Sequence, residues 1–533
     1  MASFPRPIAL AALAIAFGSA DAPAQANPAA RGSSTTPRVA TTNRVAPVVT
    51  EQIASGLSIF SATCGELATA QINAEVEPHI AINPLNPNHL LGAWQQDRHT
   101  NGAARGVVSG VSLDGGATWA LRTIPVSTCS GGTLTRGTDP WVAFSPDGTA
   151  HLTVLGVAGT SFTPNGVSAI VVARSTDGGF NWSTPVTVLS NGGDFFNDKQ
   201  AITADPLDSR FVYAVWDRLR ATGGGPTMFA RTTNGGVTWE PAREIFDPGN
   251  GQTIGNLVRV LPNGTLVNLM TVITPGSTAL NVIRSTDRGE TWSAPILVSS
   301  MTSLGARDPN TGTLIRDGAI IAQMAVAPDG ALYAVWQDAR FTQQRDAIAL
   351  SKSRDGGLTW SAPVRVNFNP NVIAFTPQVH VRADGIVGVT YYDLRSDTTA
   401  PSLLTDFWIA RSPDGETWTE SRVSAPFDMT FAPQAGGQYF VGDYTGLVSA
   451  GSTFIAFYGK AIPSTTNRSD IFAARIAPVI PTFLGFLTKD ARTAMSYRAE
   501  AMPTDAPEPG FVDRTFETAV RVMKARVPGW TGP

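Results

Sequence analysis

The chain has 533 residues, a formal net charge of −3 and an isoelectric point near 6.0. Lysine and arginine are scattered along it, so no basic surface is expected for a nucleic-acid backbone, and we exclude nucleic acid as a partner. No apolar stretch is long enough for a membrane-spanning helix, and we expect a mature protein without a membrane span.

The N-terminus has the features of an export signal. Arg6 precedes an apolar run from Ile8 to Phe17, and Ala24-Gln25-Ala26 supplies the small residues of a cleavage site. We therefore expect residues 1–26 to be a signal peptide, and the protein to be secreted or periplasmic. Residues 27–50 are rich in Ala, Ser, Thr and Pro and are predicted to be a flexible leader.

The chain has two cysteines, Cys64 and Cys129. Export permits a disulfide between them. Two buried thiols are the alternative that the sequence leaves open.

A short motif recurs six times between residues 112 and 418. Each copy has Ser or Thr, then Asp or Asn two positions later, Gly after a further two and Trp after a further three; the last copy is one residue shorter. The short acceptor can bind backbone N–H groups ahead of it, Gly supplies the positive φ of a tight turn, and Trp can be buried beneath the hairpin. The acceptor positions, which we interpret as structural, are Asp114, Asp177, Asn234, Asp287, Asp355 and Asp414.

Each copy of the motif lies between two apolar, strand-like runs, such as Ala169–Ala173 and Pro185–Val188 around the second copy. Two more strands precede each copy, joined by turns such as Ser145-Pro146-Asp147-Gly148. A period in the fifties predicts one unit of four-stranded antiparallel sheets instead of several domains. The sheets are expected to begin near Glu75, Asp139, Asp198, Ile254, Ile320 and Phe375.

The motif resembles the Asp-box of the sialidase-like, or BNR-repeat, β-propellers of the secreted bacterial type. The resemblance covers about Glu75 to Ile476 and implies an all-β propeller over residues 51–476. We favour seven blades, and six blades with an accessory sheet is the alternative. The seventh unit, which has no motif, would use a strand from the segment Val45 to Ile59 together with the runs Tyr439–Val441, Thr453–Phe457 and Ile471–Ile476.

Residues 477–533 depart from the repeating pattern. Asp490 to Ala501 and Val512 to Ala525 are predicted to be helical, and Phe516, Val520 and Met523 of the second segment share one stripe. We expect a small helical appendage packed on the propeller.

In the family that the motif resembles, the Asp-boxes lie on the face away from the active site. On the opposite face, four second strands end in an aromatic residue followed by Asp and Arg. We expect these arginines to surround one mouth, where their planar guanidinium groups could bind a carboxylate. The alternative is that each Asp–Arg pair is a salt bridge that joins blades. The arginines are Arg98, Arg218, Arg340 and Arg395.

Catalytic residues are predicted from the same face. Asp97 and Asp393 could act as general acid or base, and Tyr391 or Tyr392 could be a nucleophile of the sialidase kind. Residues that enter the first strands lie on this face too, and Asp139 and Asp198 among them are expected to bind substrate. The other residues at these positions could equally be ordinary polar loop residues. They are Glu75, Glu77, Arg136, Lys199, Tyr439 and Asp443.

The sequence departs from the sialidases at the start of the first blade. Their Arg-Ile-Pro motif corresponds here to Glu77-Pro78-His79-Ile80, so one of three carboxylate-binding arginines is missing. Three functions therefore stay open: a sialidase-like glycosidase acting on an acidic sugar, which we favour; a polysaccharide lyase with Tyr392 or His99 as base; and a non-catalytic propeller that binds glycan or protein.

No cofactor is expected. His79 and His99 occur without a further Cys/His cluster, and this pattern does not predict a metal site. We expect a carbohydrate ligand and a monomeric protein.

Overall fold

The structure is a computed structural model that describes residues 46–399, 401–478, 495–498, 511–527 and 529–530. The predicted signal peptide and most of the predicted leader lie outside these ranges. Within them, no helix is both long and apolar enough to cross a membrane.

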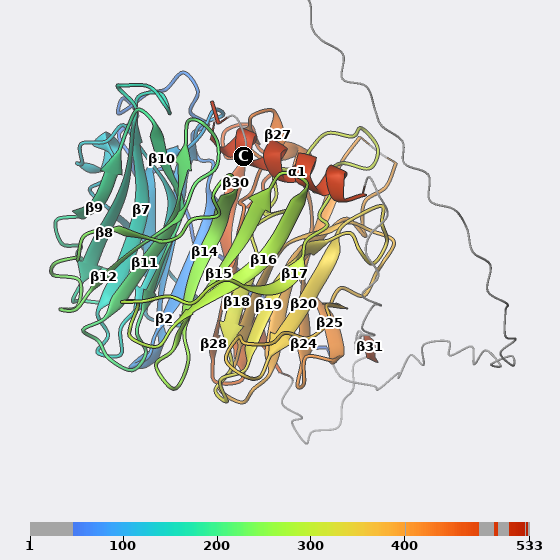
Figure 1. Cartoon of the computed structure of the whole chain (residues 1–533). Helices are drawn as coiled ribbons and strands as arrows, with labels where there is room; N and C mark the ends of the chain where they lie inside the picture. Colours follow the sequence, from blue (N-terminus) through green and yellow to red (C-terminus); the bar gives the residue numbers. More distant parts are fainter. Residues whose placement is uncertain (1–45, 400, 479–494, 499–510, 528, 531–533) are drawn as a thin grey trace, which may run out of the picture. The chain divides into compact units, whose positions relative to one another are not determined.

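The described chain is almost entirely β-structure, and its strands form antiparallel groups of four that follow one another in the sequence (Figure 1). A single pairing, between Ala104 and Gly137, links the first two groups. The first three groups are β2 (Val76–Asn83), β3 (Asn86–Arg98), β4 (Ala104–Ser112) and β5 (Ala120–Thr123); β6 (Arg136–Phe144), β7 (Ala150–Ala158), β8 (Val167–Ser175) and β9 (Val186–Asn191); β10 (Phe195–Ala204), β11 (Val212–Arg220), β12 (Thr227–Thr232) and β13 (Arg243–Phe246).

The next three groups repeat this order, and each begins within a few residues of the predicted start. They are β14 (Gln252–Val260), β15 (Leu266–Thr274), β16 (Ser277–Ser285) and β17 (Ile296–Ser300); β18 (Gln323–Val326), β19 (Leu332–Asp338), β20 (Ala347–Ser353) and β21 (Val364–Arg365); β22 (Ala374–Val381), β23 (Val387–Asp393), β24 (Leu404–Ser412) and β25 (Thr417–Asp428).

The last group combines the two ends of the repeating region. β28 (Gly446–Ala450), β29 (Thr453–Ala461) and β30 (Ser469–Ala477) are joined by β1 (Val48–Ile53), which pairs with β30 from Val48↔Ala477 to Ile53↔Phe472. The predicted role of the N-terminal segment, as the fourth strand of this sheet, is confirmed.

The predicted first strand of this group was wrong. Tyr439 belongs to β27 (Gln438–Tyr439), which pairs with β26 (Gln434–Ala435) instead. Gly446 allows β28 to take the strand position, because a Cβ at this residue would stand only 3.0 Å from the backbone nitrogen of Ile80 on β2. Only glycine permits so close an approach.

The first strand of each group contacts the first strand of the next, and β28 contacts β2. Aliphatic and aromatic side chains from neighbouring groups fill the space between the sheets, and the most deeply buried include Trp94, Trp216, Trp336 and Trp418. This arrangement of four-stranded sheets is consistent with a β-propeller.

The six repeated turns share one hydrogen-bond pattern. In the first, the Ser112 hydroxyl donates to Asp114 (2.8 Å) and accepts from the backbone of Gly116 (2.8 Å), while the Asp114 carboxylate accepts from the backbone of Thr118 (2.9 Å). The same bonds recur in the other five turns, with Asn234 replacing the carboxylate once. The local sequence thus determines these hairpins.

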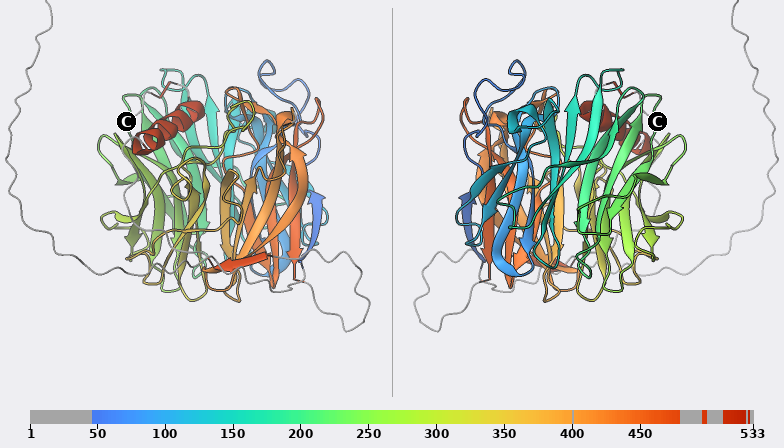
Figure 2. Two further views of the ribbon diagram at one scale, coloured as in Figure 1. Left: turned by 90° about the vertical axis from the view of Figure 1, so that its right-hand side faces the viewer. Right: turned by 90° about the vertical axis from the view of Figure 1, so that its left-hand side faces the viewer.

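The C-terminal region contributes one helix and one strand. Helix α1 (Phe511–Arg526) matches the prediction, and Met523 is buried against the core with Phe516 and Val520 beside it. The helix predicted over 490–501 was wrong where the structure describes it, since β31 (Met495–Arg498) pairs with β25. α1 and β31 lie at opposite ends of the sheets (Figure 2), and β31 is at the end that carries the repeated turns.

Candidate functional site

Five of the first strands contain a β-bulge at equivalent positions. The register shifts between Val76 and His79 in β2, and in the same way in β6, β10, β14 and β22. Each bulge places one residue at positive φ, a conformation that re-aims its side chain. The residues at positive φ are Glu77, Asp139, Lys199, Gly255 and Thr376.

Three of these bulges form a buried charge cluster. Nζ of Lys199 lies 2.7 Å from Oδ1 of Asp139, 3.1 Å from Oε1 of Glu77 and 3.6 Å from Oδ2 of Asp443, and 4.1 Å from the centre of the Tyr444 ring. Burial, followed by repulsion from Asp139, raises the pKa of Glu77 to about 7. The lysine therefore holds three largely buried carboxyl groups together.

Two arginines lie beside this cluster. Arg316 donates Nε and Nη2 to the two oxygens of Asp443, at 3.2 and 2.9 Å. The guanidinium groups of Arg316 and Arg98 lie 4.6 and 5.1 Å from the centre of the Phe440 ring. A bidentate ion pair thus fixes Arg316, and the aromatic ring positions Arg98 next to it.

Arg98 has no direct carboxylate partner among the described residues. It donates Nη1 to Oε1 of Gln95 (2.8 Å), and its Nε is buried without an acceptor. Burial and the nearby charge of Arg316 lower the pKa of Arg98 to about 10, which leaves it protonated at neutral pH. A buried guanidinium with an unused donor is suited to bind an incoming anion.

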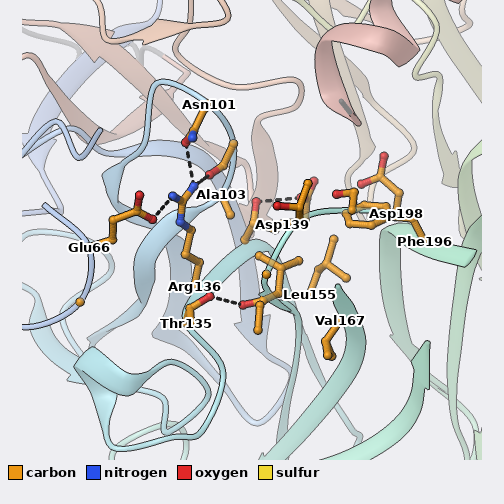
Figure 3. A pocket seen from close by; sticks show the side chains of 18 of the residues that line it. Glu66, Asn101, Ala103, Thr135, Arg136, Asp139, Leu155, Val167, Phe196 and Asp198 are labelled. Carbon is orange, nitrogen blue, oxygen red and sulfur yellow. Dashed lines mark hydrogen bonds and ion pairs between the residues drawn. The ribbon is translucent and has the colours of Figure 1, made fainter. Parts of the chain in front are cut away.

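These groups open into a cavity of about 650 Å³, here called the arginine pocket. Leu155, Val157 and Val167 form part of its apolar wall, and Figure 3 shows the polar residues that face them. The charged lining residues are Glu66, Arg98, Arg136, Asp139, Asp198 and Arg316.

One rim of the arginine pocket is held by Arg136 and by a disulfide. Arg136 forms an ion pair with Glu66 and donates to Oδ1 of Asn101 (2.8 Å) and the carbonyl of Gly102 (2.7 Å), as Figure 3 shows. Cys64 and Cys129 are joined by a disulfide, which settles the alternative that the sequence left open. The lining residues Gly65, Glu66 and Thr128 flank this bond.

The four predicted arginines do not meet at one mouth, and that expectation was wrong. Arg98 lines the arginine pocket together with the predicted binding residues Asp139 and Asp198, whereas Arg218, Arg340 and Arg395 are not among its lining residues. Arg218 and Arg395 bind carboxylates on the outer strands of their own groups, and Arg340 reaches the outer strand of the preceding group.

The partners of these three arginines are those expected for salt bridges that join strands. Arg218 pairs with Glu244 of β13, and Arg340 pairs with Asp338 (2.8 Å) and donates to Oγ of Ser299 (3.0 Å) on β17. Arg395 pairs with Asp393 and Glu420 and stacks 3.6 Å from the centre of the Trp408 ring.

The predicted catalytic residues are buried away from the pocket. Asp97 accepts from Nη1 of Arg105 (2.8 Å), and Asp393 is bound by Arg395. The Tyr391 hydroxyl donates to Glu420, and the Tyr392 hydroxyl donates to the carbonyl of Gly459 (2.7 Å).

Burial also raises the pKa of Tyr391 and Tyr392 well above the usual value, which opposes formation of a phenolate. None of Asp97, Tyr391, Tyr392 and Asp393 lines the arginine pocket, so their catalytic roles stay predictions that this geometry does not favour.

The two histidines also lie outside the lining of the pocket. His99 shares a hydrogen bond with Thr69 (2.9 Å), and burial, then the charge of Arg136, lower its pKa to about 4. His79 stacks on Trp141, 3.8 Å between ring centres.

Arg316 is the main residue that the sequence did not reveal. It lies within the irregular connection between β17 and β18 and belongs to no repeated pattern. Its role depends on contacts with Asp443, 127 positions later in the chain. Only the fold brings these two residues together.

No family model and no curated protein matches the chain. Solved structures do match. A protein of unknown function from Dyadobacter fermentans is 16% identical, with 80% of this chain and 99% of that chain covered and a TM-score of 0.43.

Two further matches are named enzymes. The GH93 α-L-arabinofuranosidase of Fusarium graminearum is 12% identical, with coverage of 79% and 97% and a TM-score of 0.44. The intramolecular trans-sialidase from Ruminococcus gnavus is 15% identical, with coverage of 80% and 99% and a TM-score of 0.40. The repeated turns of this chain resemble the Asp-boxes of the sialidase-like propellers.

Proposed function

We propose that the protein is a secreted glycan-processing hydrolase that binds an acidic sugar in the arginine pocket. The observation that carries this proposal is Arg98, a buried guanidinium that lines the pocket beside Arg316 and has no carboxylate at ion-pair distance among the described residues. A ligand carboxylate would supply the missing counter-ion through a bidentate contact.

The pocket also contains carboxyl groups for acid–base chemistry. Asp139 and Asp198 come from the neighbouring strands β6 and β10, and both line the cavity. Glycosidases use two carboxyl groups on either side of the scissile bond, one to protonate the leaving oxygen and one to act on the anomeric carbon or a water. We assign these two roles to Asp139 and Asp198 jointly.

Nζ of Lys199, 2.7 Å away, holds the Asp139 carboxyl group in place beside the pocket. Asp139 also accepts from the hydroxyl of Thr138 at 2.8 Å. Within this proposal Asp139 is the carboxylate, acting as nucleophile or base, and Asp198 is the acid.

The proposal includes a propeller of seven blades. It is supported by the cycle of contacts that runs through the first strands and returns from β28 to β2, and by the pairing of β1 with β30. Such a closed arrangement would place the arginine pocket at the end of the sheets opposite the repeated turns.

A non-catalytic glycan-binding protein is the second candidate. It is favoured by the pairing of Arg316 with Asp443 and of Asp139 with Lys199, because both pairs already satisfy charges that catalysis would use. In that case Arg98 would still bind the acidic sugar, and Asp139 would be structural.

A measurement of sugar turnover distinguishes the hydrolase from the non-catalytic glycan-binding protein. The purified mature chain is incubated with a fluorogenic sialoside and with a panel of acidic polysaccharides, while reducing ends and near-ultraviolet absorbance are recorded. Hydrolysis that is lost in Arg98→Gln and in Asp198→Asn supports the hydrolase.

The matched control is Arg218→Gln, an arginine of the same repeated pattern outside the pocket, which should keep full activity. New ultraviolet absorbance would indicate a lyase instead. Binding of acidic sugar without any turnover would indicate the non-catalytic protein.

A further inference from the structure

A second cavity lies between the bulges and the ends of the sheets that carry the repeated turns. Its volume is about 310 Å³, and its wall takes residues from β2, β6, β10, β14, β18, β22 and β28. We call it the strand-lined cavity. Every four-stranded group thus contributes its first strand.

An aromatic layer separates this cavity from the charge cluster. The Trp141 ring, which stacks on His79, lies 5.3 Å from the centre of the Tyr444 ring, and Tyr444 lies directly beneath Lys199. The strand-lined cavity and the arginine pocket share no lining residue. A ligand in one would therefore not contact a ligand in the other.

The wall of the strand-lined cavity contains one arginine and no acidic residue. Arg259 donates Nε to the carbonyl of Met324 (2.7 Å) and Nη1 to the carbonyl of Val258 (3.3 Å), and its Nη2 has no acceptor in the part of the chain that the structure describes. No described carboxylate lies at ion-pair distance. Arg259 is half-buried in a wall that is otherwise mostly apolar, and no carboxylate of that wall supplies its counter-ion.

His79 adds a neutral donor to the same wall. Its Nδ1 accepts from the backbone of Val142 at 3.3 Å, so the neutral ring carries its proton on Nε2. Burial and the charge of Arg259 keep the pKa of His79 well below its usual value. The polar groups of this cavity therefore favour negative charge and offer no ligand set for a metal cation.

We propose that the strand-lined cavity binds a small inorganic anion, chloride or phosphate, through the Arg259 guanidinium and the Nε2 proton of His79. The anion neutralises Arg259 and links the first strands around it. It is independent of the sugar site, and it binds whether or not the protein is a hydrolase.

The test measures stability against anion concentration. Urea unfolding is followed at constant ionic strength while sodium gluconate is replaced by sodium chloride, and in a second series by sodium phosphate. Above the dissociation constant, each tenfold rise in a bound anion should raise the folding equilibrium constant about tenfold, because the anion binds only the folded state. The series that shows this dependence identifies the anion.

The dependence should disappear in Arg259→Met and persist in Arg284→Met. Arg284 is a matched control, since it lies on β16 and likewise donates Nε to a backbone carbonyl, that of Gly356 at 2.8 Å, but does not line the cavity. An unchanged dependence in Arg259→Met, or none in the wild type, would overturn the proposal.

A second measurement does not depend on the variant folding. Crystals of the wild-type protein soaked in sodium bromide should show an anomalous peak beside Arg259, which soaking in phosphate should displace if phosphate is the natural ligand. Bromide peaks at surface sites only, with phosphate also absent from the cavity, would overturn the proposal as well.

Discussion

Nζ of Lys199 lies 2.7 Å from Oδ1 of Asp139, and each residue is only 5% exposed. Both stand at positive φ in equivalent bulges of neighbouring first strands. The same lysine contacts Glu77 and Asp443. One ammonium group therefore maintains the arrangement of carboxylates behind the arginine pocket.

Lys199→Met is expected to lower the free energy of unfolding by about 3–5 kcal/mol at pH 7, because it leaves buried carboxylates without their cation. The loss should shrink as the pH falls toward 4.5. Glu77 already has a raised pKa of about 7, so its proton uptake restores stability below that value. Urea unfolding at pH 7 and pH 5 measures both quantities.

Lys352→Met is the matched control, since this lysine pairs at 2.7 Å with Glu416, which is 41% exposed. Its loss should stay below about 1 kcal/mol. A Lys199→Met protein that loses as much stability at pH 5 as at pH 7 would contradict the account of the cluster.

Burial of the tryptophans predicts their contributions to stability. Trp418 of the sixth repeated turn is fully buried, whereas Trp182 of the second is half-buried and donates to the Ser109 hydroxyl at 3.2 Å. Trp418→Ala should cost about 3–5 kcal/mol, and Trp182→Ala about 1–3 kcal/mol. Denaturant unfolding measures the loss of stability in each variant. A larger loss in Trp182→Ala would show that the half-buried rings contribute more to stability than the fully buried one.

The disulfide between Cys64 and Cys129 closes a loop across 65 positions of sequence. Replacing both cysteines with serine is expected to lower stability by about 2–4 kcal/mol, because the unfolded chain gains freedom. Dithiothreitol should bring the wild type down to the level of the double variant and leave that variant unchanged. If dithiothreitol destabilised both proteins equally, its effect would not come from the disulfide between Cys64 and Cys129.

The buried carboxyl group of Asp317 is expected to make the stability of the protein depend on pH. It accepts from the backbone of Ala306 (2.7 Å) and from Nε2 of Gln337 (2.8 Å), and burial raises its pKa to about 7. The folded state therefore holds this proton more tightly than the unfolded state does. The contribution of this proton to the free energy of unfolding is complete below pH 3.8 and is lost as the pH rises through 7. The loss is at most about 4 kcal/mol.

Unfolding of the wild type and of Asp317→Asn between pH 4 and pH 8 tests this dependence. In the variant, the part of the slope of the unfolding free energy against pH that Asp317 contributes should be absent. As a control, Asp287→Asn should keep it, because a hydrogen bond from Thr291 lowers the pKa of Asp287 to about 2, outside this range. Equal slopes in wild type and Asp317→Asn would refute the assignment.

Local sequence was sufficient to predict the six sheets that carry a repeated turn. The acceptor, glycine and tryptophan of each repeated turn act within a few residues of one another, so the spacing alone revealed the hairpins and the order of the strands. The error at Tyr439 arose because the true first strand of the last group depends on a glycine contact with Ile80, far away in the sequence.

The candidate site was only partly predictable. Asp139, Asp198 and Arg98 were expected on one face, and they line one pocket. Repetition misled in the case of Arg218, Arg340 and Arg395, because a residue at the end of a strand can turn inward or toward an outer strand, and its local sequence is the same in both cases. Arg316 and its partner Asp443 required the fold.

The most direct test of the central claim is a crystal structure of the protein soaked with N-acetylneuraminic acid or with glucuronate. The carboxylate of the bound sugar is expected to accept hydrogen bonds from Arg98 and Arg316, with Asp139 and Asp198 beside the ring. A sugar bound elsewhere on the molecule, at Arg218, Arg340 or Arg395 or among the repeated turns, would contradict it.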